Sequence, residues 1–176
     1  MLRTMKTSFY THSFDLNRLF QANRTSADVW NDCLLLAKAY HQKHGKWITQ
    51  TELQKQTKGK YPLHSQSIQA VCHKYLWNRD SIKKAREKGL STARYPYKRK
   101  HHFNTKWAKD GFKVDENGKV ELSLGIHGGK RQQPITIWIK KVPVGQIKEI
   151  ELIFDRHLMV CLSYEDGRLG MQLAEE

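Results

Sequence analysis

The side chains best suited to chemistry lie in residues 93–107, ARYPYKRKHHFNTKW, where aromatic rings alternate with cations. Lysine and arginine neutralise phosphates and release counterions, which gives affinity for nucleic acid with little sequence information. Tyrosines such as Tyr95 and Tyr97 can stack on unpaired bases. For Phe103 and Trp107 two alternatives stay open, because aromatic residues here either stack on bases or join the core.

Charge is segregated along the chain. The sequence carries a formal net charge of +14, and residues 61–107 alone hold 11 Lys and Arg against 2 Asp and Glu. Residues 145–176 hold 3 against 7. A surface that is merely solvated would scatter its charge more evenly. The pattern therefore indicates a polyanionic partner, with nucleic acid ahead of an anionic membrane surface.

Catalysis has less support than binding. A metal-dependent nuclease needs several convergent acids around Mg²⁺, and the acidic residues of 110–121 and 149–155 do not assemble such a set. His101 and His102 could serve a metal-independent ribonuclease, since imidazole titrates near neutral pH. Beside three cations they fit a phosphate-binding surface more simply. We predict no catalytic residue, no metal ligand and no cofactor.

The glycine-rich stretch IHGGKRQQP lacks the spacing of a Walker loop. We expect it to be a flexible connection from which Lys130 and Arg131 meet phosphate. The three cysteines, Cys33, Cys72 and Cys161, form no CxxC pair and no Cys/His quartet. They predict reduced core thiols in a cytoplasmic protein rather than a zinc site or a disulfide framework.

No run approaches the ~20 apolar residues of a membrane span. The first ten residues, MLRTMKTSFY, lack the apolar centre of a signal peptide. We therefore expect no membrane association.

Hydrophobic periodicity predicts three helices. The first is expected from about Ala27 to His44, with Thr25 and Asp28 as a capping box and Gly45 as its stop. Residues 17–24 are expected to be a connection, with the start of a helix as the alternative.

The other two helices follow at once. Thr49 and Glu52 form a second capping box that opens a short helix. A long helix over 65–88 has Ser65 as its N-cap and Gly89 as its stop. Its apolar stripe consists of Ile68, Val71, Cys72, Tyr75 and Ile82.

Strands bracket these helices. We expect a first strand over 5–11, a hairpin over 110–125 turning at Asn117-Gly118, a strand over 134–141, and two strands over 146–164 that meet at Asp155-Arg156. Alternation is mostly one-sided, which suits a small closed antiparallel β-barrel. The sequence thus predicts an α+β fold, a small antiparallel barrel with a three-helix insertion.

A short helix followed by a long one also occurs in helix-turn-helix proteins. On the long helix, Gln66 and Gln69 lie at i and i+3, with His73 and Lys74 nearby. Glutamine can bind adenine through two hydrogen bonds in the major groove. An ordinary polar helix face is the alternative.

The order of these pieces resembles the N-terminal part of TnpB, the transposon-encoded RNA-guided nucleases, and of the related type V CRISPR effectors. The resemblance lies in VWNDCLLLAKAYHQ, LHSQSIQAVCHKYLWNRDSIKKA, ARYPYKRKHHFNTKW and IKEIELIFDRHLMVCLSYE, and it covers nearly the whole chain. In that family the strands form a wedge barrel, which is OB-like, and the helices form an inserted recognition lobe. The resemblance implies four segments: 1–15, the first wedge strand; 16–100, the recognition lobe; 101–165, the rest of the wedge barrel; and 166–176, an acidic C-terminal tail.

The resemblance further implies guide RNA and target double-stranded DNA as partners, in the cytoplasm of a prokaryote and associated with the nucleoid. It places Gln66, Gln69 and Lys74 near the duplex that bears the target-adjacent motif, and the stretch from Arg94 to His102 along the nucleic-acid backbone. The full set of predicted nucleic-acid-binding residues is Gln66, Gln69, His73, Lys74, Lys83, Lys84, Arg86, Arg94, Tyr95, Tyr97, Lys98, Arg99, Lys100, His101, His102, Lys130 and Arg131.

The family continues into a RuvC-like nuclease domain and a zinc ribbon, whereas this sequence ends with YEDGRLGMQLAEE. We therefore expect the recognition half alone, without cleavage of its own or with cleavage supplied by a separate RuvC-bearing chain. The alternatives are a stand-alone helix-turn-helix-like DNA-binding transcriptional regulator, a small His-dependent ribonuclease, and an interaction subunit with an acidic protein partner.

Overall fold

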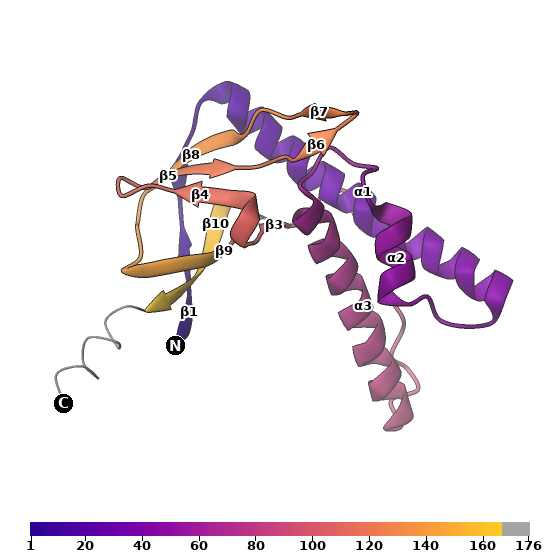
Figure 1. Ribbon diagram of the computed structural model, residues 1–176. Helices are drawn as coiled ribbons and strands as arrows, with labels where there is room; N and C mark the ends of the chain where they lie inside the picture. The colour runs from indigo at the N-terminus through magenta and orange to yellow at the C-terminus, as the bar shows by residue number, and fades with distance from the viewer. Residues whose placement is uncertain (167–176) are drawn as a thin grey trace.

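The computed structural model describes residues 1–166 and has an α+β fold, with three helices inserted between strands (Figure 1). The first strands are β1 (Leu2–Thr7) and β2 (Phe9–Tyr10). The helices are α1 (Ser13–His44), α2 (Gln50–Thr57) and α3 (Ser65–Glu87). After the helices come β3 (Thr105–Trp107) and the 3₁₀ turn η1 (Lys109–Gly111). The remaining strands are β4 (Phe112–Val114), β5 (Lys119–Leu122), β6 (Ile126–His127), β7 (Lys130–Arg131), β8 (Ile135–Ile139), β9 (Gly145–Asp155) and β10 (His157–Asp166). The predicted fold class is thus confirmed at the level of α+β.

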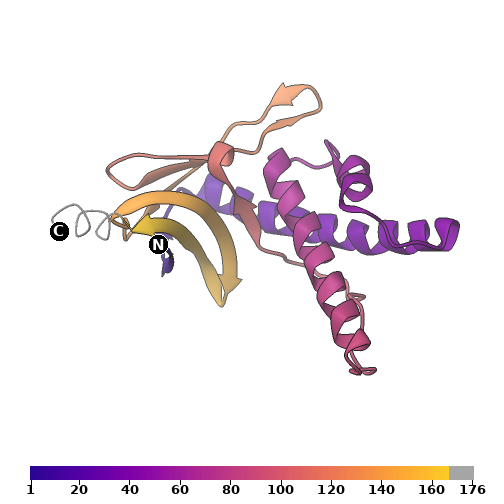
Figure 2. The same cartoon turned by 60° about the horizontal axis from the view of Figure 1, so that its bottom comes forward.

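The strands form two four-stranded antiparallel sheets and one two-stranded ribbon. The first sheet has the order β1-β10-β9-β3 and the second β2-β8-β5-β4, while β6 pairs with β7. In Figure 2 the long hairpin of β9 and β10 curves strongly below the second sheet. The single strand predicted over 5–11 begins earlier and changes sheet at Ser8, since β1 pairs with β10 and β2 with β8.

The closed barrel that we predicted does not form within residues 1–166. The edge strands of the two sheets, β3 and β4, follow one another in the chain, and η1 turns the chain from one sheet into the other. β3 pairs only with residues 150–152 of β9, so residues 145–149 pair with β10 alone. The main chain passes from one sheet to the other at Ser8 and at η1, but strand pairing among the described residues does not continue between the two sheets.

The hairpin predicted around Asn117-Gly118 is confirmed, with a different turn. The carbonyl of Asp115 accepts from the N–H of Gly118 (3.3 Å), and Gly118 has a φ of 83°. Asp115 Oδ1 accepts from the N–H groups of Asn117 and Lys119, each at 2.9 Å. The turn is centred on Glu116 and Asn117, and Gly118 fills the left-handed bulge position that only glycine adopts easily.

Helix α1 begins well before the predicted Ala27, at Ser13. The capping box expected at Thr25 was wrong, because Thr25 Oγ1 donates back to the carbonyl of Gln21 within the helix (2.9 Å). The polar side chains around Thr25 instead contact a strand: Ser26 Oγ lies 2.7 Å from Thr105 Oγ1 of β3, and Thr105 Oγ1 donates to Asn23 Oδ1 (2.8 Å). This buried network fixes α1 to β3.

The caps of the other helices follow the prediction with one correction. Thr49 caps α2 by accepting from the N–H of Glu52 (3.2 Å). α3 is capped by His64, whose Nδ1 accepts from the N–H of Gln66 (3.1 Å), and Ser65, the predicted cap, is already helical. Gly89 ends α3 with a φ of 102°, as predicted.

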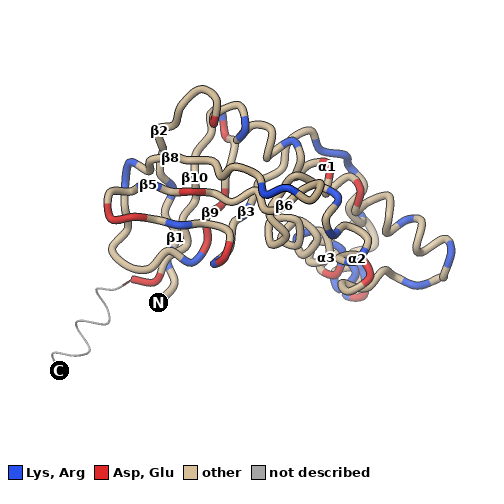
Figure 3. Tube along the Cα trace, turned by 45° about the horizontal axis from the view of Figure 1, so that its top comes forward, with Lys and Arg blue, Asp and Glu red and all other residues tan. Residues whose placement is uncertain are grey.

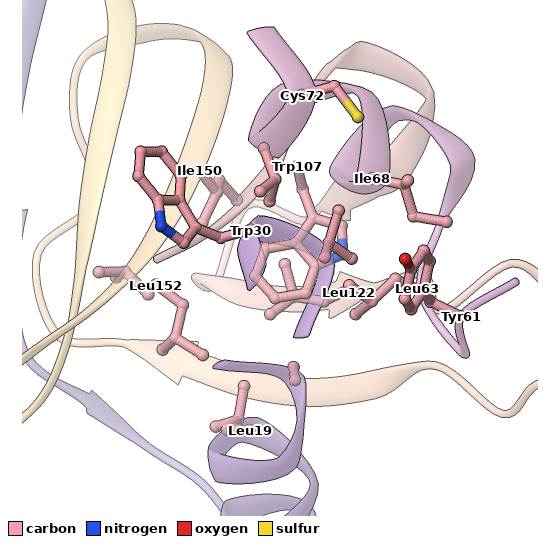
Figure 4. Close-up of a cluster of buried hydrophobic side chains, with 14 of the residues drawn as sticks. Leu19, Trp30, Tyr61, Leu63, Ile68, Cys72, Trp107, Leu122, Ile150 and Leu152 are labelled. Carbon is pink, nitrogen blue, oxygen red and sulfur yellow. The ribbon is translucent and has the colours of Figure 1, made fainter. Parts of the chain in front are cut away.

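The core lies where α1, α3 and both sheets meet (Figure 4). Trp107 on β3 is 0% exposed, and its Nε1 donates to the carbonyl of Ser123 (2.8 Å). Phe103 is half-buried and stacks on Trp30, with ring centroids 5.1 Å apart. Trp107 is therefore a core residue and does not stack on bases, which were the two alternatives for it. The inward face of β8 is Ile135, Ile137 and Ile139, as predicted.

The helices pack against each other through buried polar and sulfur groups. Cys33 and Cys72 are both fully buried, with their sulfurs 3.9 Å apart across the α1–α3 contact. The hydrogen bond with Cys72, together with burial, raises the pKa of the Cys33 thiol. Both are core cysteines, as expected, whereas Cys161 on β10 is only partly buried.

None of the three helices in the described chain combines the length and the apolar character that a bilayer span requires. Apart from Asp166, which ends β10 and pairs with Arg3, the predicted acidic tail lies outside the described residues.

Candidate nucleic-acid interface

Positive charge gathers on the helical part of the molecule (Figure 3). Residues 13–104 hold 18 Lys and Arg against 6 Asp and Glu, whereas the described residues on either side, 1–12 and 105–166, hold 12 against 9. The sheets are therefore close to neutral. A polyanion would meet the helices first.

The centre of this surface is residues 94–102, here called the basic segment, which returns from the end of α3 towards β3. Its main chain is fixed to α1. Trp30 Nε1 donates to the carbonyl of Lys98 (3.2 Å), and Asn31 bonds both the N–H of Lys100 (2.8 Å) and its carbonyl (2.9 Å). Just beyond the segment, the N–H of Phe103 donates to the carbonyl of Asn23 (3.0 Å). Because the anchors are main-chain groups, the side chains are left to face outward.

Cations and rings alternate along this surface as the sequence indicated. Several cations lie 5.0–6.0 Å from ring centroids: Lys100 over Trp30 and Phe103, Arg86 over Tyr95, and Arg94 and Lys98 over Tyr97. Each cation–π contact of this kind is worth ~0.5–1 kcal/mol at an exposed site. The contacts orient the side chains while leaving their charges accessible to solvent.

The remaining residues of the basic segment differ in exposure. Arg99 and His101 are exposed. His102 is exposed as well, but its ring stacks on Phe154 of β9, with centroids 5.9 Å apart. The segment therefore spans from the α1 surface to the first sheet.

Of the predicted binding residues in the first half of α3, some face solvent and others make hydrogen bonds within the protein. Gln69 is exposed, whereas Gln66 is half-buried and its Nε2 donates to Asp110 of η1 (3.4 Å). His73 Nε2 lies 2.8 Å and 3.0 Å from the amide nitrogens of Gln50 and Gln54 on α2. Gln69 therefore has its amide available, while Gln66 and His73 serve contacts within the protein.

Further along α3, the side chains face solvent. Lys74 lies over the ring of Trp77 at 5.4 Å, and Lys83 and Lys84 are exposed in the last turns, beside Arg86. Arg86 also donates to the carbonyl of Ala93 (3.0 Å), which holds the basic segment near the end of the helix.

A cleft of about 300 Å³ lies between α3, the end of the basic segment and β9. Lys74, Lys100 and Lys106 line it from three different segments, together with His102. The carboxylate of Glu151 is also there, and it accepts from Asn104 Nδ2 (3.0 Å). Lys106 also pairs with Glu149 (3.6 Å), so Lys74 and Lys100 are the cations that give this cleft the charge to accept a backbone phosphate.

Lys130 and Arg131 do not join this cluster. They form β7 of the ribbon, and the base of that ribbon, at Gly125, packs on His64 at the beginning of α3. The basic segment starts at the other end of α3. The ribbon is thus a second, smaller group of exposed cations, and it is a hairpin rather than the flexible connection that we expected.

In residues 1–166 no three His, Cys, Asp or Glu side chains are placed to share a metal ion. Burial lowers the pKa of His64, and the charge of Asp110 raises it in part. His64 is the cap of α3 and lies outside the basic segment.

Sequence reasoning missed the residues that pack around the basic segment. The Trp47 and Tyr95 rings contact each other at a tilt of 42°, with centroids 4.8 Å apart, and the guanidinium of Arg79 lies 5.8 Å from the Trp47 centroid. Arg79 also donates to the carbonyl of Ile48 (2.6 Å). Trp47 follows Gly45, the glycine that ends α1, and a tryptophan in such a connection could have indicated a ring that packs near the basic segment.

No family model matches the chain, and no curated protein matches it.

Proposed function

We propose that this chain is the recognition half of an RNA-guided DNA-targeting protein of the TnpB type. The helical part would bind the structured scaffold of a guide RNA and help dock target duplex DNA. The observation that carries the proposal is the basic segment, fixed to α1 by its main chain while Lys98 and Arg99 stay exposed. A chain already held in place can follow a phosphate backbone with little further loss of conformational entropy.

The element order supports this proposal. Helices inserted after the first strands, and followed by the remaining strands, match what the resemblance implies for a recognition lobe in a wedge domain. We propose that the two sheets together are that wedge domain. Their near-neutral charge suits a scaffold, while the charged helices suit the nucleic-acid side.

In this account the RNA carries the sequence specificity and the protein recognises shape and backbone. Gln69 and Lys74, both accessible on α3, would approach the duplex that bears the target-adjacent motif.

The regulator alternative has less support from the helices. Residues 58–64 join α2 to α3, a longer connection than the three to four residues of a typical helix-turn-helix. His73, on the side of α3 that would have to be free, lies against α2.

The test is the salt dependence of RNA binding. The variant Lys98→Ala, Arg99→Ala, Lys100→Ala removes three cations from the basic segment. The matched control Lys113→Ala, Lys140→Ala, Lys141→Ala removes three exposed cations from the sheets. Binding of a structured hairpin RNA is measured by filter binding across a range of salt.

We expect the basic-segment variant to bind weakly and to lose about two to three units of the slope of log K against log salt, because each phosphate contact contributes ~0.7–0.9. The control should keep the wild-type slope. Equal slopes for the two variants, with both folded by circular dichroism, would exclude the basic segment as the binding surface.

A further inference from the structure

Beside the basic segment lies a second feature, a groove between α1 and residues 95–99 with a volume of about 530 Å³. Its floor is apolar and consists of Leu34, Ala37 and Tyr75. Leu35, also on α1, lines the groove and is 57% exposed. A groove of this size and lining falls in the range of small-molecule sites.

Aromatic rings form the walls of the groove. Trp47 and Tyr95 face each other at 4.8 Å, with their planes inclined by 42°. Tyr97 stands beside them and is 57% exposed. Flat, partly exposed rings of this kind accept another flat ring by stacking.

The rim of the groove is cationic. Lys38 lines it from α1 and Arg99 lines it from the basic segment, while the ring of His41 packs on Trp47 with centroids 5.0 Å apart. Gln42 adds an amide that can pair with the edge of a base. The described residues that line the groove include neither Asp nor Glu. The groove therefore suits an occupant that is flat and apolar in the middle and anionic at its edge, which is the chemistry of a nucleotide.

We propose that this groove binds one unstacked base of single-stranded RNA, with the flanking phosphates on Lys38 and Arg99. The inference rests on the proposed function and adds a site to it, because Arg99 belongs both to the basic segment and to the groove. Because the basic segment adjoins the groove, a nucleotide is favoured over an apolar peptide, whose binding the neighbouring cations would not strengthen. The groove would thus mark where the bound RNA stops being a duplex.

The test compares two probes with the same phosphates. One is an unstructured oligo-uridine of about 12 nucleotides, and the other is an equally long strand of abasic ribose units. The variants are Tyr97→Leu, which keeps an apolar side chain but removes the ring, and Leu35→Glu, which puts an anion into the groove. The control is Tyr10→Leu on β2, since Tyr10 is 60% exposed and lies outside the groove.

We expect the wild-type protein to bind the uridine strand about tenfold more tightly than the abasic strand, as one stacked base allows. Tyr97→Leu and Leu35→Glu should lose this preference, and Tyr10→Leu should keep it.

Two results separate the inference from the proposed function. If wild-type protein binds hairpin RNA but does not distinguish the two strands, or if Tyr97→Leu keeps the preference, the groove proposal is overturned and the proposed function stands. If neither the hairpin nor either strand binds at low salt, both are overturned. Circular dichroism melts of each variant show that the fold is retained.

Discussion

Asn31 fixes the basic segment, and replacing it with alanine is the most informative single change. The side chain is 7% exposed and makes two hydrogen bonds to the main chain of Lys100, at 2.8 Å and 2.9 Å. No charge is altered by Asn31→Ala. The change therefore separates the position of the cations from their number.

The expected cost follows from the two hydrogen bonds. Each contributes ~1 kcal/mol net, so about 2 kcal/mol favouring the docked segment is lost. The bond from Trp30 to Lys98 and the bond from Phe103 to Asn23 remain, so the segment should loosen without the helices unfolding. If binding must then order the segment again, RNA affinity falls by the same amount, about thirtyfold.

Two measurements check this. Hydrogen exchange followed by mass spectrometry should show faster exchange in peptides that cover 97–103, with α1 and β9 unchanged. Hairpin RNA binding should weaken while its salt slope stays at the wild-type value, because every cation is still present. The matched control is Asn17→Ala, an exposed asparagine on the same helix. Unchanged exchange over 97–103, or a changed slope, would falsify the assignment of Asn31 as the anchor.

The other predictions concern the fold around α3. The pKa of His64 is lowered in the folded state, chiefly because the side chain is buried. Unfolding therefore takes up protons at mildly acidic pH. The free energy of unfolding should fall as pH is lowered from about 6.5 through the lowered folded pKa. Urea titrations should show this dependence flattened in His64→Ser, which keeps a capping oxygen, and identical pH profiles would contradict it. Gly125→Ala should destabilise more than Gly128→Ala by thermal melting, because both have positive φ but only at Gly125 would the new Cβ lie 3.1 Å from the Cα of His64; equal losses would show that this approach is unimportant. Cys33 and Cys72 should react with a thiol reagent only on unfolding, as counted by mass spectrometry, and rapid labelling of the native protein would refute their burial.

Local patterns predicted much of this fold. The apolar stripe of α3 from Ile68 to Tyr75, the Thr49 cap and the glycine stops of α1 and α3 follow from short-range chemistry that the sequence displays directly. Ile82, the last residue of the predicted stripe, is only partly buried. The alternation in β8 placed its isoleucines correctly for the same reason.

The errors come from long-range contacts. Thr25 and Asp28 predicted a helix start because threonine followed three residues later by an acid is typical of a capping box, but Thr25 bonds within the helix, and its neighbours Asn23 and Ser26 bond Thr105, which is distant in the sequence. β3 escaped notice because it is short and lies in a cation-rich stretch. The sequence could not show that the strands form two separate sheets, because apolar and polar residues alternate in the same way in a closed barrel and in two sheets joined at η1.

The candidate site shows the same division. Composition located the basic segment, since charge and aromatic content are visible in the sequence. Its attachment to Trp30 and Asn31, and the groove beside it, depend on how α1 packs against residues 95–100, which no local pattern encodes.

The central claim is tested most directly by sequencing the RNA that co-purifies with the tagged chain from its native cells after a high-salt wash. The account predicts one dominant structured RNA, retained by the variant lacking Lys113, Lys140 and Lys141 and lost from the variant lacking Lys98, Arg99 and Lys100. A random mixture of RNAs, no RNA, or equal recovery with both variants would contradict it.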